Sequence, residues 1–216
     1  MDHTDEYEQG ERVRAWLREN GSSLVGGVAL GLACLLGWNW WQDRGEQAKY
    51  LAATEFHAFS KALEAGEENK AKAHLSVLQT EFPTLPYATL AALRQADALQ
   101  KQGKFDEAVA ALDAAPADGI DPTLRALCQL RAARLLLESG KADAALARLD
   151  AAVEDAYPAL AAELRGDAEL ARGNRDAARD AYNRALVALD VAAQLRGIVE
   201  LKLTEAGGAP TAGPEA

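Results

Sequence analysis

Few side chains in this sequence are of the types that bind metals or act as catalytic nucleophiles. The histidines are His3, His57 and His74, and the cysteines are Cys34 and Cys128. His57 and His74 fall in one predicted helical hairpin, where their imidazoles could approach each other. A structural zinc site needs four ligands, usually with thiolates or a third histidine among them, and neither cysteine is placed to join this pair. We therefore expect two ordinary surface or partly buried histidines and no metal.

Enzymatic activity and nucleic-acid binding are also disfavoured. The sequence has no P-loop, nucleophile elbow, dinucleotide-binding fingerprint or HExxH motif. Its carboxylates are spread along predicted helix faces, which is typical of solvated surfaces. Asp plus Glu number 33 against 23 Lys plus Arg, a formal net charge of −10, whereas nucleic acids are bound mainly through Lys and Arg. We expect a protein-binding chain that uses no cofactor, no nucleic acid and no small-molecule substrate.

One set of charged side chains could contribute to a binding surface. Asp97, Arg134 and Asp167 recur at one offset from aligned glycines, so they should occupy equivalent sites in successive repeats. They predict a charge ladder, which is either a structural set of ion pairs between neighbouring helices or a polar strip that contacts a bound segment. Three leucines are expected nearby and would add apolar contact: Leu93, Leu130 and Leu160.

These side chains depend on a repeated helical hairpin. Gly66, Gly103, Gly140 and Gly173 are spaced 37, 37 and 33 residues apart. Each glycine is followed five residues later by Ala and nine residues later by a larger residue. Seven residues before each of the last three glycines there is a small residue, Ala or Gly. Glycine can take the left-handed conformation that ends a helix, and small residues let two helices cross closely. A period near 34 with these residue types is the tetratricopeptide pattern.

The predicted fold class is therefore all-α, with an α-solenoid of about four tetratricopeptide-like hairpins over residues 42–204. The first hairpin, Glu46 to Phe82, departs most from the pattern because Phe59 occupies its small position. Asp190 to Thr204 is predicted to be a final capping helix, since the last apolar face of a stack needs cover. Residues 205–216 are predicted to be a disordered tail.

An apolar segment, residues 22–41, precedes the hairpins. Its 20 residues carry no charge, and as a helix they span roughly 30 Å, the thickness of the hydrocarbon core. Trp38, Trp40 and Trp41 crowd one end, where aromatic rings settle at the headgroup level. A cleaved signal peptide would have a shorter apolar core and a small-residue cleavage site, and a soluble core helix would not be apolar on every face. The segment is predicted to be a transmembrane helix surrounded by membrane lipid.

The flanking charges predict the orientation of this helix. Arg12, Arg14 and Arg18 precede it, while Arg44 and Lys49 follow it. The positive-inside rule therefore favours, by one charge, a cytoplasmic N-terminal tail over residues 1–21.

Glycines within the apolar segment predict a contact face. Gly27 and Gly31 form a GxxxG pair, and Ala33 with Gly37 forms a second small-residue pair. Small residues let helices approach closely in lipid, although glycine is also frequent in spanning helices that make no such contact.

The sequence resembles a known family in several stretches. They are Arg18–Gly21 before the apolar segment, Gly37–Trp41 at its end, and, in the repeats, Leu130–Arg134, Ala142–Leu146 and Leu164–Asp167. In this order and spacing, the sequence from about Asp5 to Leu203 is similar to the YfgM family, ancillary subunits of the bacterial SecYEG translocon. The C-terminal tail is longer than expected for that family.

The resemblance implies an inner-membrane protein with a cytoplasmic N-terminus and a periplasmic tetratricopeptide-like domain. It implies association with the SecYEG translocon and with the periplasmic chaperone PpiD, and a role in passing secreted proteins to such chaperones. No catalytic residue is implied. Two other functions stay open from the residues: a regulatory role for the cytoplasmic tail, whose acidic cluster is Asp5, Glu6, Glu8 and Glu11, and a scaffold for another envelope assembly.

Overall fold

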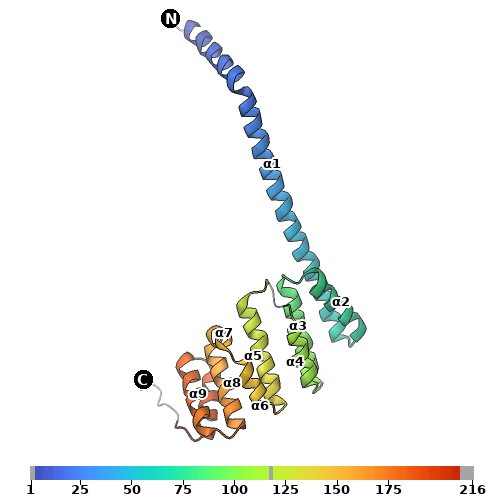
Figure 1. Cartoon of the computed structure of the whole chain (residues 1–216), viewed down its shortest axis with the longest axis vertical. Helices are drawn as coiled ribbons and strands as arrows, with labels where there is room; N and C mark the ends of the chain where they lie inside the picture. Colours follow the sequence, from blue (N-terminus) through green and yellow to red (C-terminus); the bar gives the residue numbers. More distant parts are fainter. Residues whose placement is uncertain (1–2, 117–118, 210–216) are drawn as a thin grey trace. The chain divides into compact units, whose positions relative to one another are not determined.

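The computed structural model describes residues 3–116 and 119–209, and every regular element within them is a helix (Figure 1). The chain divides into two units, Met1–Leu51 and Ala52–Ala216. Helix α1 (His3–Glu64) contributes residues to both, and each unit is described by itself. The side chains of the acidic cluster predicted to form a regulatory site lie outside the described residues.

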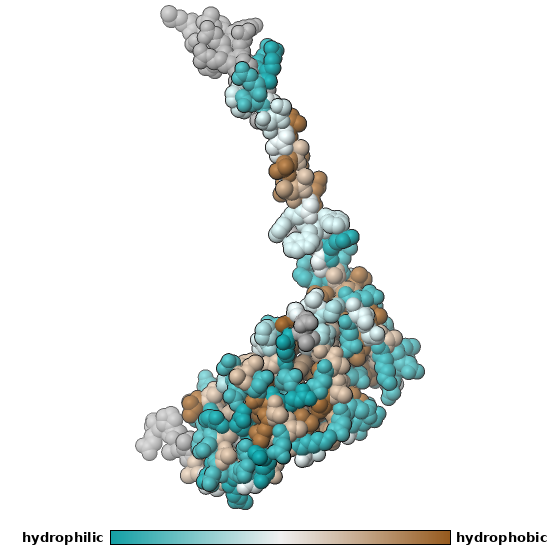
Figure 2. Space-filling view, in the orientation of Figure 1, coloured by the Kyte–Doolittle hydropathy of each residue, from teal (hydrophilic) through white to brown (hydrophobic). Residues whose placement is uncertain are grey.

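The first unit consists of α1 up to Leu51. It contains one candidate membrane span, Arg18–Trp38, with 21 residues, a mean hydropathy of 1.6 and no buried share. Figure 2 shows apolar side chains along this part of α1. Trp38 and Trp41 meet edge to face with ring centroids 5.6 Å apart, and the guanidinium of Arg44 lies 4.1 Å from the Trp40 ring centroid. This arrangement fits a spanning helix with an aromatic and cationic end at a headgroup layer.

The second unit is a stack of helical hairpins, which confirms the predicted all-α solenoid. The remainder of α1 pairs with α2 (Glu68–Glu81), and α3 (Pro86–Lys101) pairs with α4 (Phe105–Asp113). Helix α5 (Pro122–Glu138) pairs with α6 (Ala142–Arg148) and α7 (Ala151–Ala156). Helix α8 (Pro158–Ala171) pairs with α9 (Arg175–Ala188), and α10 (Gln194–Glu205) follows.

The aligned glycines end the first helix of each hairpin as predicted. Gly66, Gly103, Gly140 and Gly173 have φ between +72° and +83°, a region that only glycine adopts without strain. The residue after each glycine donates its N–H to the carbonyl of the residue five positions before it in the chain, as Lys104 does to Leu99 at 3.0 Å. This is the Schellman arrangement, which satisfies carbonyls left free at a helix end.

The close helix crossing in the fourth hairpin joins Gly166 of α8 to Tyr182 of α9. Tyr182 is fully buried, and a Cβ placed on Gly166 would lie 2.4 Å from its ring. The glycine therefore leaves the space that the tyrosine ring fills. In the second and third hairpins the same two positions hold Ala and Leu, so a smaller residue at the crossing accompanies a larger one opposite.

One helix of the stack is interrupted, and another begins later than predicted. The second helix of the third hairpin is interrupted at Leu149, and α7 begins anew because the Asp150 carboxylate accepts the Val153 N–H at 3.0 Å, a capping bond that competes with helix continuation. Helix α10 begins at Gln194 instead of Asp190, whose carboxylate accepts the Ala192 N–H in a turn.

The folded part extends slightly beyond the predicted start of the tail. Glu205 lies in α10, and Ala206 is buried. Residues 210–216 of the predicted tail lie outside the described residues.

Candidate protein-interaction site

The three charged residues of the predicted ladder lie on the first helices of successive hairpins. Asp97 is on α3, Arg134 on α5 and Asp167 on α8. No ion pair joins them to one another within the described part of the chain. Each instead reaches the next first helix along the stack, with N–O distances of 3.9 Å for Asp97–Arg131, 3.0 Å for Arg134–Glu163 and 2.6 Å for Asp167–Lys202. The three residues thus form ion pairs between neighbouring first helices, and their partners occupy other offsets in those helices.

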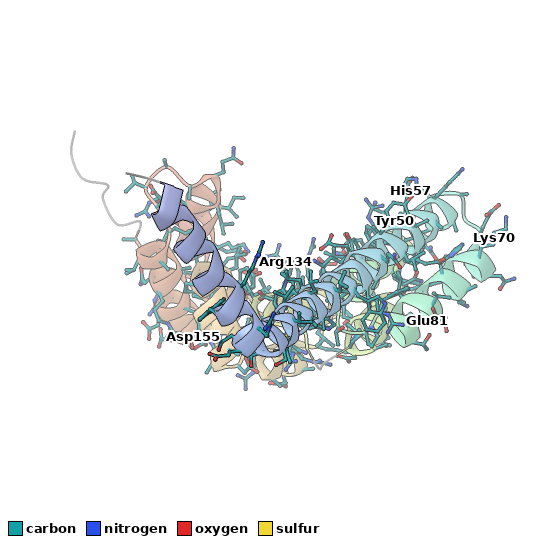
Figure 3. All side chains as sticks on the ribbon, turned by 90° about the horizontal axis from the view of Figure 1, so that it is seen from above. Tyr50, His57, Lys70, Glu81, Arg134 and Asp155 are labelled. Atoms are coloured by element: carbon teal, nitrogen blue, oxygen red, sulfur yellow. The ribbon has the colours of Figure 1, made fainter. Side chains whose placement is uncertain are left out.

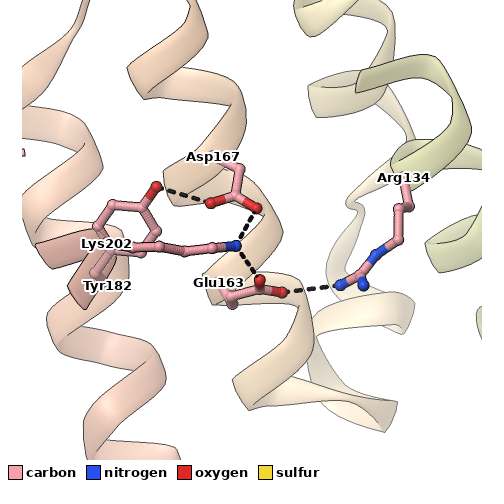
Figure 4. Close-up of polar contacts among 5 residues, drawn as sticks. All are labelled: Arg134, Glu163, Asp167, Tyr182 and Lys202. Atoms are coloured by element: carbon pink, nitrogen blue, oxygen red, sulfur yellow. Dashed lines mark hydrogen bonds and ion pairs between the residues drawn. The ribbon is translucent and has the colours of Figure 1, made fainter. Parts of the chain in front are cut away.

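Glu163 is the centre of this network (Figure 4). It is 2% exposed, and its carboxylate contacts both Arg134 of α5 and Lys202 of α10. A buried carboxylate is tolerated only where cations and hydrogen bonds compensate for lost water. Glu163 therefore ties three successive first helices together. The sequence gives one signal for it, because Leu93 and Leu130 occupy the corresponding position in the two preceding repeats.

Lys202 and Tyr182 complete the network from the other side of Asp167. The Tyr182 hydroxyl donates to Asp167 Oδ1 at 2.8 Å, and Lys202 Nζ lies 2.6 Å from Asp167 Oδ2. Burial, with the hydrogen bond to Asp167, raises the pKa of Tyr182 well above its usual range. Burial acts to lower the pKa of Lys202, but the hydrogen bonds to Asp167 and Glu163 outweigh it, so that pKa is raised. Both groups thus hold their protons firmly, which suits a structural network better than proton transfer.

The part of the ladder on α3 and α5 is more exposed. The side chains of Asp97 and Arg131 are each 48% exposed, and that of Arg134 is 43% exposed. Together with Leu93 they line a pocket of about 10 Å³, room for about one water molecule. This surface, the α3–α5 strip, is defined by Leu93, Asp97, Arg131 and Arg134. It can offer polar contacts to a bound segment but no deep pocket for a side chain.

The predicted leucines differ in their availability. Leu130 is 6% exposed and belongs to the core, so its assignment to a groove surface is wrong. Leu93 and Leu160 are partly buried and pack against the same core. The buried position of Leu130 follows from its helix phase, which points it between the hairpins.

The histidines have different surroundings. His74 Nδ1 lies 2.7 Å from Glu55 Oε2, which joins α2 to α1, whereas His57 is exposed (Figure 3). Among the described residues no three side chains of the types His, Cys, Asp and Glu are grouped to hold a metal ion. The side chain of His3 lies outside the described residues.

The glycines of the apolar segment have open space around them. A Cβ on Gly27, Gly31 or Gly37 would meet no atom within 4 Å. Gly27 and Gly31 lie one turn apart on one face of α1, while Gly37 is rotated from them by about 100°. A helix that packs against Gly27 and Gly31 would therefore not contact Gly37 directly. Ala29 lies on the face of α1 opposite to this pair.

Comparisons with known proteins match almost the whole chain. The family model described as a tetratricopeptide repeat-like domain matches residues 14–208. A protein of Escherichia coli (strain K12) named "Ancillary SecYEG translocon subunit" is 31% identical over 201 residues, covering 93% of this chain and 96% of that protein. The protein of the same name from Haemophilus influenzae is 25% identical over 181 residues, covering 84% and 88%. Among solved structures, a MamA fragment from Desulfovibrio magneticus RS-1 is 22% identical, with a TM-score of 0.49 over 72% of this chain and 89% of that one.

Proposed function

Because this chain belongs to the tetratricopeptide repeat-like family of ancillary SecYEG translocon subunits, we propose that it is a non-enzymatic adaptor of the translocon. One observation carries this proposal: the similarity to the Escherichia coli relative covers 93% of the chain and so includes both the apolar helix and the repeats. In this proposal residues 22–41 cross the inner membrane, residues 1–21 are cytoplasmic and residues 42–204 form a periplasmic domain. The domain helps transfer secreted proteins from the translocon to periplasmic chaperones such as PpiD.

The apolar helix supports the membrane part of the proposal. Its side chains are exposed, and a helix of this length and hydropathy is stable only in a lipid or protein environment that covers it. Anchoring also holds the repeat domain near the translocon, so that a modest affinity for a chaperone or an emerging chain suffices.

Within the membrane, the Gly27/Gly31 face is the contact proposed for a translocon helix. Open space at both glycines lets another backbone approach closely. Leucine at both positions should prevent that approach. Ala29→Leu is the control, because it places a leucine side chain on the opposite face of the helix.

Outside the membrane, the α3–α5 strip is the contact proposed for a chaperone or secreted chain. The test variant is Asp97→Ala with Arg131→Ala, which removes a half-exposed ion pair with an N–O distance of 3.9 Å. Because exposed ion pairs contribute little to stability, the variant should fold like the wild type. The matched control is Asp106→Ala with Lys141→Ala, another exposed pair that joins α4 to the start of α6 away from the strip.

The experiment is a mild-detergent pull-down of the full-length protein and these four variants, with SecY and PpiD followed by immunoblot. We expect wild-type protein to recover both. Gly27→Leu/Gly31→Leu should reduce recovery of SecY while Ala29→Leu does not, and the strip variant should reduce PpiD while its control does not. Failure of the wild-type protein to recover SecY from an otherwise intact translocon would refute the proposed function.

The orientation has its own test. Protease added to spheroplasts should degrade the repeat domain and spare the N-terminal tail. Protection of the repeat domain in intact spheroplasts, with degradation after lysis, would mean that the orientation is reversed.

A further inference from the structure

Helix α10 ends in the same way as the first helices of the four preceding repeats. Gly207 has φ +87°, follows Gly173 by 34 residues, and is followed by the same Schellman bond, from Gly208 N–H to Leu203 O at 2.9 Å. The four complete repeats begin their second helix two residues after the glycine, as Arg175 follows Gly173. After Gly207 the sequence instead reads Gly-Ala-Pro-Thr-Ala-Gly-Pro over residues 208–214. Nothing in the described chain covers α10 as the second helices cover their partners.

Helix α10 is apolar at the position where the second, third and fourth repeats are charged. Asp97, Arg134 and Asp167 each lie six residues before their glycine and form an ion pair with the next first helix. The residue six before Gly207 is Leu201, and it is 74% exposed. Terminal helices of repeat stacks normally present a polar outer face to water. Leu201 departs from that rule at the position that would contact a next helix.

Exposed apolar side chains are concentrated at this end. Among the described residues after Leu51, four large hydrophobic side chains are exposed: Val187, Val191, Ile198 and Leu201. All four lie in the last turn of α9, the following turn and α10. The other large apolar side chains of this unit, across four complete hairpins, are at least partly buried. The concentration indicates a contact surface at the open end of the stack.

The exposed residues of α10 form one face with a single charge. They are Gln194, Gly197, Ile198, Leu201, Thr204 and Glu205, spaced as one helical stripe. The opposite face holds Val199 and Leu203, which are buried against the stack. We call the six exposed residues the α10 outer face. By contrast, the exposed residues of α9 include several charges, among them Arg175, Asp176, Asp180 and Arg184.

We propose that the α10 outer face binds the same face of a second copy of this chain, in an antiparallel pair about a two-fold axis. With the axis between Ile198 and Leu201, each Ile198 faces the Leu201 of the other copy, and each Gln194 faces Glu205. Two-fold pairs are self-complementary in this way. The Gln194 amide can donate to the Glu205 carboxylate, so the one charge of the face gains a hydrogen bond at each end.

Charge and shape favour a second copy as the occupant. The chain carries a formal charge of −10, so two copies repel over most of their surface and can meet best where charge is scarce. A Cβ on Gly197 would meet no atom within 4 Å, so the second helix can approach closely there. Anchoring in one membrane raises the local concentration, so that a small contact area suffices.

Cysteine cross-linking of the full-length chain in membranes tests the pairing. The background is Cys34→Ala, with Cys128 retained because it is buried and its pKa is raised to about 11. We expect a short bismaleimide to give a homodimer, of twice 23.0 kDa, with Leu201→Cys. The matched control is Ala147→Cys, an exposed residue of α6, which should give none. Equal cross-linking at both sites, no dimer at either, or cross-links from Leu201→Cys only to other proteins would overturn the proposal.

A mass measurement separates this contact from pairing through the anchor. Light scattering in detergent is compared for wild-type protein, Leu201→Glu, and Gly27→Leu/Gly31→Leu. We expect Leu201→Glu to weaken dimerisation at least about tenfold, since it places an unpaired carboxylate opposite an apolar residue, while the anchor variant stays dimeric. Leu201→Glu should melt like the wild type because Leu201 is exposed in the single chain. A dimer that survives Leu201→Glu would refute the proposed interface.

Discussion

The crossing of α8 and α9 gives the most direct prediction about stability. Gly166→Ala should destabilise the repeat domain, because the added methyl would lie 2.4 Å from Tyr182 Cε1 and 2.5 Å from Cδ1. Both atoms belong to the ring of a fully buried residue, so the ring or the helix must move. Overpacking of this kind costs about 1–3 kcal/mol, and the better helix propensity of alanine offsets about 1 kcal/mol.

We therefore expect a net loss of roughly 2 kcal/mol at most, which for a domain of this size lowers the melting temperature by about 4–8 °C. The assay is thermal unfolding of the full-length protein in detergent, followed by circular dichroism. Gly45→Ala is the matched control, since it makes the same substitution in a helix with no atom within 4 Å of the new methyl. It should not lower the melting temperature.

A second substitution tests the cause. Tyr182→Leu alone should destabilise, because it leaves a gap opposite Gly166 and removes the hydroxyl bond to Asp167. Combined with Gly166→Ala it recreates the Ala–Leu crossing of the second and third hairpins. The double variant should be more stable than the sum of the single effects by roughly 1–3 kcal/mol. Strict additivity of the two single effects would refute the steric reasoning.

Further predictions concern the ion network and the buried thiol. Glu163→Ala should lower the melting temperature more than Arg134→Ala, because Glu163 is buried between two cations whereas the Arg134 side chain is 43% exposed; equal effects in thermal melts would contradict the assigned burial. Raised pKa values of Lys202 and Tyr182 mean that the folded state keeps protons that the unfolded state loses, so stability should be fully present below about pH 10 and fall as the pH rises further. Lys202→Met should weaken that alkaline loss, and an unchanged slope in melts between pH 9 and pH 11 would count against it. Cys128 should resist maleimide in the folded protein and react after unfolding; rapid labelling of the native protein would show that the core around it opens readily.

Much of the architecture was readable from the sequence because it depends on local rules. Glycines at a fixed interval predict helix ends, because a helix that ends in this way needs a residue with positive φ. All four aligned glycines have a positive φ. An uncharged run as long as a bilayer is thick predicts a spanning helix without reference to any partner. The small residue opposite a large one was likewise predicted, and Gly166 with Tyr182 shows it most clearly.

The partners of the charged residues were decided only by the tertiary structure. Asp97, Arg134 and Asp167 share an offset, and the sequence placed them correctly in equivalent sites. Their pairing depends on how far each first helix is shifted and rotated against the next, a quantity that no local pattern contains. Glu163 illustrates this, since an apparently ordinary helix carboxylate becomes the buried centre of the network once α5 and α10 close around it.

The sequence by itself thus determined the helices, the turns between them and the apolar anchor, because backbone conformation and hydropathy act over a few neighbouring residues. The packing of whole helices decided which positions became core and which stayed open. Leu130 was expected on the surface and is buried between hairpins, whereas Leu201 is exposed. Whether a helix is packed over a given position depends on the assembled stack, and no local pattern contains that information.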